Sequence, residues 1–404
     1  MRCMNAVLIA LLALASPAAQ DDPYLAHARM LHAKYPLIDG HNDLPWRMRG
    51  NFESNFDNFD IRSKHEDGQT DIPRLRAGGM GAQFWSVYVP VSLEGADAVS
   101  ATMQQIEIVR DMTDRYSDVF EMAYTADDVE RIFNKGKIAS MIGMEGGHSI
   151  NNSLQSLRAF YRQGARYMTI THSANTPWAD SCTDEPVNGG LNAFGETVIL
   201  EMNRLGMLVD ISHVSPDTMR DVLRVTRAPV IFSHSGAHGH TPHVRNVPDS
   251  VLPLVKKNGG VIMVVALDSF SSPEVHAHSL EMQKVREEAA KRFGEDDERV
   301  RQAVEKWSES HPRPTATLSQ VADQIDHIKN KIGVDHIGIG ADFDGGGGVE
   351  GLDDVSEYPQ LTAELLRRGY TDEEIGKILG LNVLRVMREA ERVSRIMQRE
   401  GNLS

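Results

Sequence analysis

The chain has 404 residues, of which 41% are hydrophobic and 25% charged. That is enough apolar sequence for a large buried core, which excludes a disulfide-stapled miniprotein and a disordered chain. Its 42 basic and 57 acidic residues give a net charge of −15, so nucleic acid and anionic lipid are poor partners for its surface. Length alone would allow two or three domains, but no linker, repeat or low-complexity tract divides the chain, and we expect one domain over residues 21–404.

The first 20 residues have the layout of a secretory signal peptide. Arg2 precedes an apolar run from Ala6 to Ala15, which is too short to span a bilayer comfortably, and small residues follow it. We expect cleavage near Ala18 or Ala19, with an uncleaved N-terminal anchor as the alternative. The signal predicts a protein that is periplasmic or secreted and keeps no stable membrane anchor after cleavage.

Short runs rich in Val, Ile and Met alternate with longer helical patterns. The predicted strands lie near Leu37–Gly40, Gly81–Val89, Ile138–Met144, Tyr167–Thr171, Met207–Ile211, Val230–Ser233, Val261–Ala266 and His336–Gly340. The predicted helices include Ala98–Tyr116, Leu154–Gln163, Gly195–Leu205 and Pro216–Val225. Eight apolar strands separated by helices favour the α/β class and a (β/α)8 TIM-type barrel, with an open doubly wound sheet as the alternative.

Two regions are longer than ordinary barrel loops. Asn51–Asp71 is polar and aromatic, and we expect an irregular flap after the first strand. Pro273–Gln320 lies between the seventh and eighth strands and is densely charged. It is predicted to be a helical insertion of one or two solvated helices, either over the barrel mouth or at a subunit contact.

Ionisable residues follow six of the predicted strands, each within two residues of the strand's end. They are His41 and Asp43 after the first strand, Glu145 after the third, His172 after the fourth, His213 after the fifth, His234 after the sixth and Asp342 after the eighth. In a parallel barrel the carboxyl ends of all strands meet at one rim, where the active sites of this fold lie. We therefore expect these side chains to converge.

Imidazoles and carboxylates that converge in this way suit Zn²⁺ or a similar divalent ion. Three histidines, one aspartate and one glutamate are one ligand too many for a single closed tetrahedral site. We expect two Zn²⁺ ions, one on His41, Asp43 and Glu145 and the other on Glu145, His213 and His234, bridged by Glu145 and a water or hydroxide nucleophile. Asp342 is predicted to accept the proton of that water and pass it to a leaving group.

Several motifs together resemble the membrane (renal-type) dipeptidase family of amidohydrolase-like barrels. They are LIDGHNDLPWRMR, GMEGGHSI, TITHSANTPWADS, VDISHVS, FSHSGAH, HVRNVPD and GIGADFDG, in the family's order along nearly the whole mature chain. The resemblance implies a binuclear zinc centre that hydrolyses dipeptides and tolerates a D-residue at the C-terminal position. It also implies a homodimer and supports the five metal ligands, with His172 on the scissile carbonyl oxygen, Arg245 on the substrate's carboxylate, Asp342 orienting the nucleophile and Trp46 beside the side-chain pocket.

One departure from the family bears on specificity. The sequence reads Val265-Ala266-Leu267-Asp268 where the family usually has an Asn-aromatic pair, so the side-chain preference stays open. Two other functions remain possible at this point. One is a related binuclear hydrolase of a non-peptide substrate such as a β-lactam or lactone, and the other is a catalytically inactive metal-dependent dipeptide-binding protein.

Further polar residues have weaker claims to a role. His238, His240 and His243 lie in a loop and are expected to be surface or substrate-side residues, while His148 is left open because it is close to Glu145. Once the signal is removed Cys182 is the only cysteine, and no sequence around it indicates a catalytic thiol.

Overall fold

The computed structural model describes residues 22–294 and 296–401, so the predicted signal peptide lies outside the described residues. Eight parallel strands close into a barrel, because the last of them pairs with the first. In barrel order they are β1 (Leu37–Asn42), β2 (Met80–Tyr88), β4 (Ile138–Glu145), β5 (Ala165–Thr169), β6 (Leu208–Asp210), β7 (Ile231–Ser235), β8 (Val261–Val264) and β9 (Ile337–Ile339). Closure confirms the predicted (β/α)8 barrel and excludes the open sheet.

Each barrel strand corresponds to one predicted strand, but a short additional strand escaped prediction. This is β3 (Phe120–Met122), which pairs in parallel with residues 138–140 at the start of β4. The same part of β4 pairs with β2 on its other edge, so β3 lies on the edge that β5 occupies further along β4. Three residues are too few for a recognisable apolar alternation.

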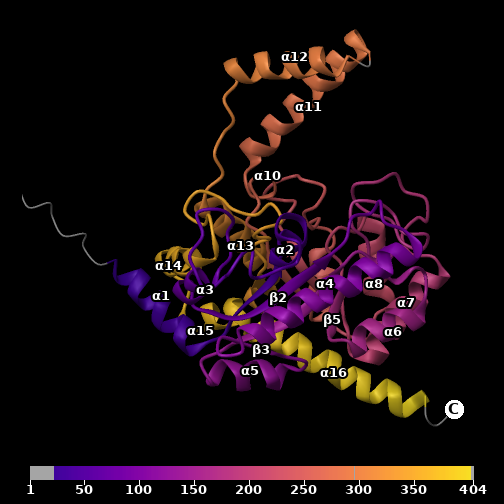
Figure 1. Ribbon diagram of the computed structural model, residues 1–404, viewed down its shortest axis with the longest axis vertical. Helices are drawn as coiled ribbons and strands as arrows, with labels where there is room; N and C mark the ends of the chain where they lie inside the picture. Colours follow the sequence, from indigo (N-terminus) through magenta and orange to yellow (C-terminus); the bar gives the residue numbers. More distant parts are fainter. Residues whose placement is uncertain (1–21, 295, 402–404) are drawn as a thin grey trace, which may run out of the picture.

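Helices surround the barrel (Figure 1). Those that precede or follow the first five barrel strands are α1 (Pro23–Lys34), α2 (Leu44–Phe52), α3 (Ile72–Ala77), α4 (Gly95–Arg115), α5 (Ala126–Asn134), α6 (Leu154–Arg162) and α7 (Ala193–Leu205). The remainder are α8 (Pro216–Val225), α9 (Leu252–Asn258), α10 (Asp268–Ser271), α11 (Pro273–Phe293), α12 (Asp297–Ser310), α13 (Leu318–Ile332), α14 (Tyr358–Arg367), α15 (Asp372–Gly376) and α16 (Asn382–Gly401). The four predicted helices match α4, α6, α7 and α8 to within three residues at either end.

Local sequence explains where these helices begin and end. The Asn192 side chain accepts hydrogen bonds from the amides of Phe194 and Gly195 at the start of α7, and Gly206 ends that helix at a φ of 84°. Thr125 and Asp128 form a reciprocal capping box at the start of α5. Such caps satisfy amides and carbonyls that a helix terminus would otherwise leave unpaired.

The region predicted as a flap after β1 is irregular from residue 53 to residue 71, but apolar side chains fix it to the barrel. Phe56, Phe59 and Ile61 are buried, and Phe59 stacks on Phe52 with ring centroids 4.3 Å apart. The segment ends at Asp71, whose carboxylate caps α3 and pairs with Arg74.

The charged segment between β8 and β9 contains α11 and α12, which stand out from the barrel as a helical arm (Figure 1). The two helices pack against each other, and α12 has no buried residue. Arg313, after the arm, forms an ion pair with Asp268 of α10, which joins the two ends of the arm at its base. Within residues 22–294 and 296–401, no helix is both long and apolar enough to cross a bilayer.

Candidate active site

The predicted site residues gather at the carboxyl ends of the strands around one cavity of about 460 Å³. His41 is fully buried beneath it, and the other eight residues line it. The complete lining is Asp43, Trp46, Tyr88, Glu145, His172, His213, His234, Arg245, Leu267, Phe270, Asp342, Asp344 and Gly345. The geometry therefore brings together every residue that the strand-end pattern selected.

Glu145, at the end of β4, lies at the centre of this group, and its two oxygens face different imidazoles. Oε2 lies 3.5 Å from His41 Nε2, whereas Oε1 lies 3.1 Å from His213 Nε2 and 3.5 Å from His234 Nε2. Asp43 Oδ2 lies 3.3 Å from His41 Nε2. A carboxylate that presents one oxygen to each of two donor groups is suited to bridging two cations.

Hydrogen bonds on the far side of the rings fix which nitrogen faces the cavity. The Tyr167 hydroxyl donates to the Gly40 carbonyl at 3.1 Å, so it accepts from His41 Nδ1 at 2.8 Å. His41 Nε2 is then the ring nitrogen that faces the cavity, and it has no hydrogen-bond partner. His213 Nε2 and His234 Nε2 lie 2.9 Å apart, a separation that needs a proton or a cation nearby. Buried acceptor nitrogens of this kind fit a metal ion.

The electrostatics of the site also favour cations. Burial lowers the pKa of His213 and of His234 well below the ordinary value, which keeps both rings neutral and able to act as ligands. Burial raises the pKa of Glu145, but the nearby His41 and His172 outweigh that effect and hold it well below its usual range. The donors form three overlapping groups that could hold an ion: His41, Glu145 and His234; Glu145, His172 and His213; His41, Asp43 and Asp342.

Asp342 and His172 lie at the edge of this cluster. Asp342 Oδ1 is 4.0 Å from His41 Nε2, and His172 Nε2 is 3.7 Å from Glu145 Oε1. Burial raises the pKa of Asp342 well above its ordinary value. The nearby His41 opposes this rise, and the carboxylates of Asp43 and Glu145 add to it. The Asp342 backbone has a φ of 67°, a left-handed conformation that is uncommon outside glycine.

Arg245 is the cation of the cavity, and it is buried rather than on the surface. Its guanidinium donates to the His234 carbonyl at 3.2 Å and lies over the Phe270 ring, 5.5 Å from the centroid. Among the residues that the structure describes, no carboxylate forms an ion pair with Arg245. A buried guanidinium without a counter-charge is suited to binding a carboxylate from the substrate.

Aromatic and aliphatic side chains form the remaining wall. Trp46 packs edge-on against Tyr88, with centroids 5.0 Å apart, and Tyr88 lies 5.0 Å from His172. Leu267 and Phe270 also line the cavity. The departure after β8 therefore leaves an aromatic side chain in the site, contributed by Phe270 of α10.

The weaker candidates lie outside the cluster. His148 Nε2 is hydrogen-bonded to the Val89 carbonyl at 3.2 Å, and His243 stacks on Phe270 with centroids 4.2 Å apart. His240 is near Asp323. Burial raises the pKa of the Cys182 thiol, which makes it a weak nucleophile. None of these residues belongs to the three groups of metal donors among the described residues.

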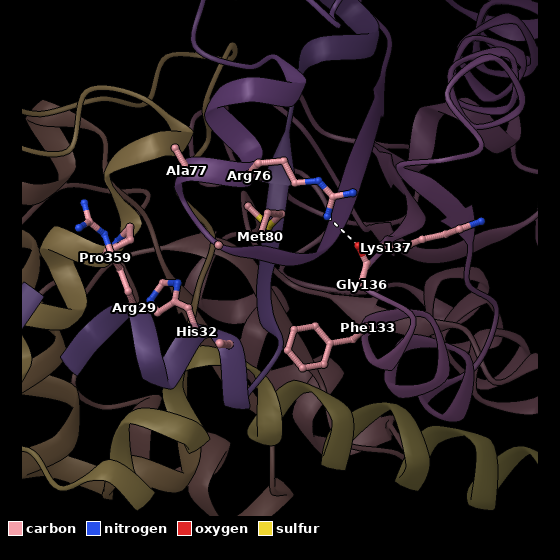
Figure 2. A pocket seen from close by; sticks show the side chains of 11 residues that line it. Arg29, His32, Arg76, Ala77, Met80, Phe133, Gly136, Lys137 and Pro359 are labelled. Carbon is pink, nitrogen blue, oxygen red and sulfur yellow. Dashed lines mark hydrogen bonds between the residues drawn. The ribbon is translucent and has the colours of Figure 1, made fainter. Parts of the chain in front are cut away.

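A second cavity, of about 340 Å³, lies at the opposite end of the barrel (Figure 2). Arg29, Arg76 and Lys137 surround it, but Arg29 and Lys137 extend in opposite directions, and Arg76 donates to the Gly136 carbonyl at 2.7 Å. These charges do not converge on one point, so the cavity is not a second candidate for an active site.

Comparison with known proteins identifies the family. The family model of membrane dipeptidase, peptidase family M19, matches residues 25–401. The chain belongs to this family. It is similar to dipeptidase verJ of Clonostachys rogersoniana, with 41% identity over 94% of this chain and 90% of that protein, and to mouse dipeptidase 3, with 40% identity over 92% of this chain and 68% of that protein.

Solved structures agree on the fold of this M19 chain. The probable dipeptidase PvdM of Pseudomonas aeruginosa superposes with a TM-score of 0.81 at 26% identity, covering 93% of this chain and 100% of that one. A metallopeptidase of Rhodobacter sphaeroides, liganded with a phosphinate mimic of the dipeptide L-Ala-D-Ala, superposes with a TM-score of 0.73 at 23% identity, covering 88% and 99%. The chain is thus a metallo-dipeptidase of the M19 family.

Five cavity residues were not predicted from the sequence: Tyr88, Leu267, Phe270, Asp344 and Gly345. Tyr88 ends β2 and could have been found by the same strand-end rule, had neutral aromatic residues been included. Phe270 lies on the four-residue helix α10, which is too short to give a recognisable local pattern.

Proposed function

We propose that this M19 dipeptidase holds two Zn²⁺ ions, on His41, Asp43, Glu145, His213 and His234, and cleaves dipeptides that present a free carboxylate to Arg245. The observation that carries the proposal is the position of Glu145, whose two oxygens face separate imidazoles in the cavity that also contains the unpaired Arg245. Two carboxylates and three imidazoles form a donor set that suits zinc better than magnesium or calcium.

The chemistry that such a pair of ions supplies when bound is Lewis acidity toward the scissile carbonyl and a water nucleophile of lowered pKa. The chain's own residues act around it. Arg245 binds the substrate's terminal carboxylate, which fixes the distance from that end to the scissile bond and excludes internal peptide bonds. His172, with an exposed side-chain fraction of 19%, donates a hydrogen bond to the carbonyl oxygen as negative charge develops on it.

Asp342 transfers the proton. As the water oxygen bonds to the carbonyl carbon, the carboxylate accepts the water's proton, and it then delivers that proton to the amide nitrogen as the carbon–nitrogen bond breaks. The products are two amino acids, and Asp342 returns to its ionised form. Trp46, Tyr88 and Phe270 provide apolar walls that exclude water from the charged groups.

We also propose that the enzyme is exported, that it forms a homodimer and that it tolerates a D-residue at the C-terminal position. The N-terminal sequence pattern supports export, and the family resemblance supports the other two. Comparing hydrolysis of L-Ala-L-Ala with that of L-Ala-D-Ala tests the stereochemical proposal, which fails if only the first is cleaved.

Metal depletion and reconstitution test the main proposal. Protein freed of metal by a chelator should hydrolyse no dipeptide, and activity should return as zinc is added, reaching its maximum at two ions per chain. Activity that resists chelation, or that is complete at one ion per chain, contradicts the binuclear site. If zinc-loaded protein hydrolyses lactones or β-lactams but no dipeptide, the enzyme acts on that other class of substrate. Tight dipeptide binding without turnover would indicate a binding protein.

A further inference from the structure

Two fully buried aspartates lie one layer below the proposed metal site, on different sides of the barrel. Asp39 is part of β1 and Asp210 is part of β6, and both have an exposed fraction of 0%. Neither forms an ion pair with a Lys or Arg among the described residues. Every hydrogen bond that these carboxylates accept comes from a backbone amide or a neutral side chain.

Asp39 connects the ends of two strands that carry site residues. Its Oδ1 accepts from the backbone amide of His41 at 2.7 Å, and its Oδ2 accepts from the backbone amide of Ala341, the residue before Asp342, at 3.0 Å. The Gln83 side chain and the Tyr358 hydroxyl donate the remaining hydrogen bonds. One carboxylate thus fixes both a proposed ligand and the proposed proton carrier.

Asp210 makes the same connection on the other side of the barrel. Its Oδ1 accepts from the backbone amides of Ser212, at 3.1 Å, and Ser233, at 2.8 Å. These residues directly precede His213 and His234. The Ser233 hydroxyl donates to Asp210 Oδ2 at 2.6 Å and therefore accepts from His234 Nδ1 at 2.8 Å, which leaves the lone pair of His234 on Nε2, facing Glu145.

The backbone shows why such anchoring is needed. His213 and Asp342 each have a φ of 67°, a conformation that residues other than glycine rarely adopt. In both cases the preceding residue donates its amide to one of the two buried carboxylates. Strained conformations persist only where the surroundings determine them, and here the same type of group does so twice.

We propose that Asp39 and Asp210 are positioning residues that hold His41, Asp342, His213 and His234 in the arrangement that binds metal. Each acts through two strand ends, and Asp210 also sets the tautomer of His234 through Ser233. This inference rests on the proposed metal site but not on the identity of the substrate. Removing either carboxylate should therefore weaken metal binding as well as catalysis.

The test is the zinc affinity of the full-length mature chain, measured by competition with a chromogenic chelator in the absence of substrate. Asp39→Asn and Asp210→Asn should each raise the zinc dissociation constant about 10- to 100-fold, the usual effect of losing a partner of a ligand. Asp180→Asn is the matched control. Asp180 is also fully buried, and its carboxylate accepts backbone hydrogen bonds from Val187, Asn188 and Gly190, none of which is a proposed ligand.

A purely structural role predicts that all three variants lose stability yet bind zinc as tightly as the wild type, and that outcome overturns the proposal. Ser233→Ala provides the decisive measurement if the aspartate variants do not fold, because it removes only the link between Asp210 and His234. It should weaken zinc binding and alter the visible spectrum of the Co²⁺-substituted protein, and wild-type values for both refute the role of Asp210. Wild-type protein that binds zinc but cleaves no dipeptide contradicts the proposed function and leaves this test intact.

Discussion

Replacing Asp342 allows proton transfer to be tested separately from metal binding. Its Oδ1 is 4.0 Å from His41 Nε2, so it borders the donor cluster, and in our proposal it carries the proton from water to the leaving amine. Asp342→Asn keeps the size and one acceptor oxygen but removes the basic carboxylate. We expect zinc content near that of the wild type and a kcat lower by about 10²-fold or more, the scale of losing a general acid–base group.

Elemental analysis of the purified variant and steady-state kinetics on one dipeptide check this expectation together. Wild-type turnover at full zinc occupancy removes Asp342 from the proton path. Loss of zinc along with activity would instead make Asp342 a ligand, in line with its grouping with His41 and Asp43.

Arg245 should determine recognition of the substrate's carboxyl end. Its guanidinium is buried, rests on Phe270 and has no carboxylate partner among the described residues, so truncation leaves a bound substrate carboxylate unpaired. Arg245→Ala should lower kcat/KM for dipeptides by about 10- to 100-fold, since a hydrogen bond to a charged group contributes roughly 1.5–3 kcal/mol. Dipeptide amides should be affected much less, and an equal loss for both substrates would show that Arg245 does not bind the carboxylate.

The sequence predicted the position of these residues because strand ends in a parallel barrel share one rim. It could not predict how they are held. The role of Asp39 in joining two strand ends depends on Ala341, 302 residues further along the chain. Similarly, the burial that distinguishes Arg245 from a surface arginine comes from Phe270 and from the β7 backbone, which no local pattern around residue 245 indicates.

At the level of elements, apolar runs of four to nine residues located all eight barrel strands, because burial on both faces leaves a continuous hydrophobic signal. The elements that the sequence did not predict correctly are those whose conformation depends on contacts with distant parts of the chain. The strand β3 exists through its pairing with β4, and the region after β1 is fixed by Phe56 and Phe59. The arm of α11 and α12 carries solvent-exposed charge on most of its surface, and its role as a subunit contact stays a prediction.

His32 offers a pH-dependent test of how the helices are attached. It links α1 to the turn before β2 and to α14, through the Gly78 carbonyl at 3.0 Å and the Thr362 hydroxyl at 2.8 Å. Burial lowers the pKa of His32 from 6.5 to about 4 in the folded protein, although the bond to Gly78 opposes the shift. Between pH 6.5 and pH 4 the unfolded chain binds a proton at His32 that the folded chain does not bind. The contribution of the neutral His32 to the free energy of unfolding is therefore fully present above pH 6.5 and is lost as the pH falls toward 4.

Between pH 7 and pH 4.5 the expected loss is roughly 2.5 kcal/mol of the free energy of unfolding for this one group, from about 1.4 kcal/mol per pKa unit. Urea unfolding of metal-free protein at pH 7 and pH 4.5 measures it without a contribution from metal release. His32→Gln should show a smaller loss between the two pH values than the wild type. Thr362→Val keeps the histidine and should retain the wild-type loss despite lower overall stability, and equal losses in all three proteins would exclude His32 as the titrating group.

The barrel encloses a cluster of metal-binding side chains, so metal ions should stabilise the folded protein. Closure of the sheet brings Asp43, Glu145 and Asp342 into one buried site with several imidazoles, and Arg245 is the one arginine or lysine among the residues that line the described cavity. Carboxylates in such a place repel one another, and burial adds to the cost of their charge. A ligand that binds only the folded chain raises its stability by mass action, by about 2.7 kcal/mol when its concentration is 100 times the dissociation constant.

Zinc should therefore raise the midpoint of thermal unfolding of the metal-free protein by a few degrees or more, in proportion to the logarithm of the free zinc concentration. Magnesium at the same concentration is the control, because it prefers oxygen ligands in octahedral geometry and should give little of this increase. Differential scanning calorimetry on chelated protein, with and without each ion, measures the shift. An unchanged midpoint with saturating zinc would mean that the cluster does not bind zinc in the folded state, whereas an equal rise with magnesium would mean that oxygen ligands alone hold the ion.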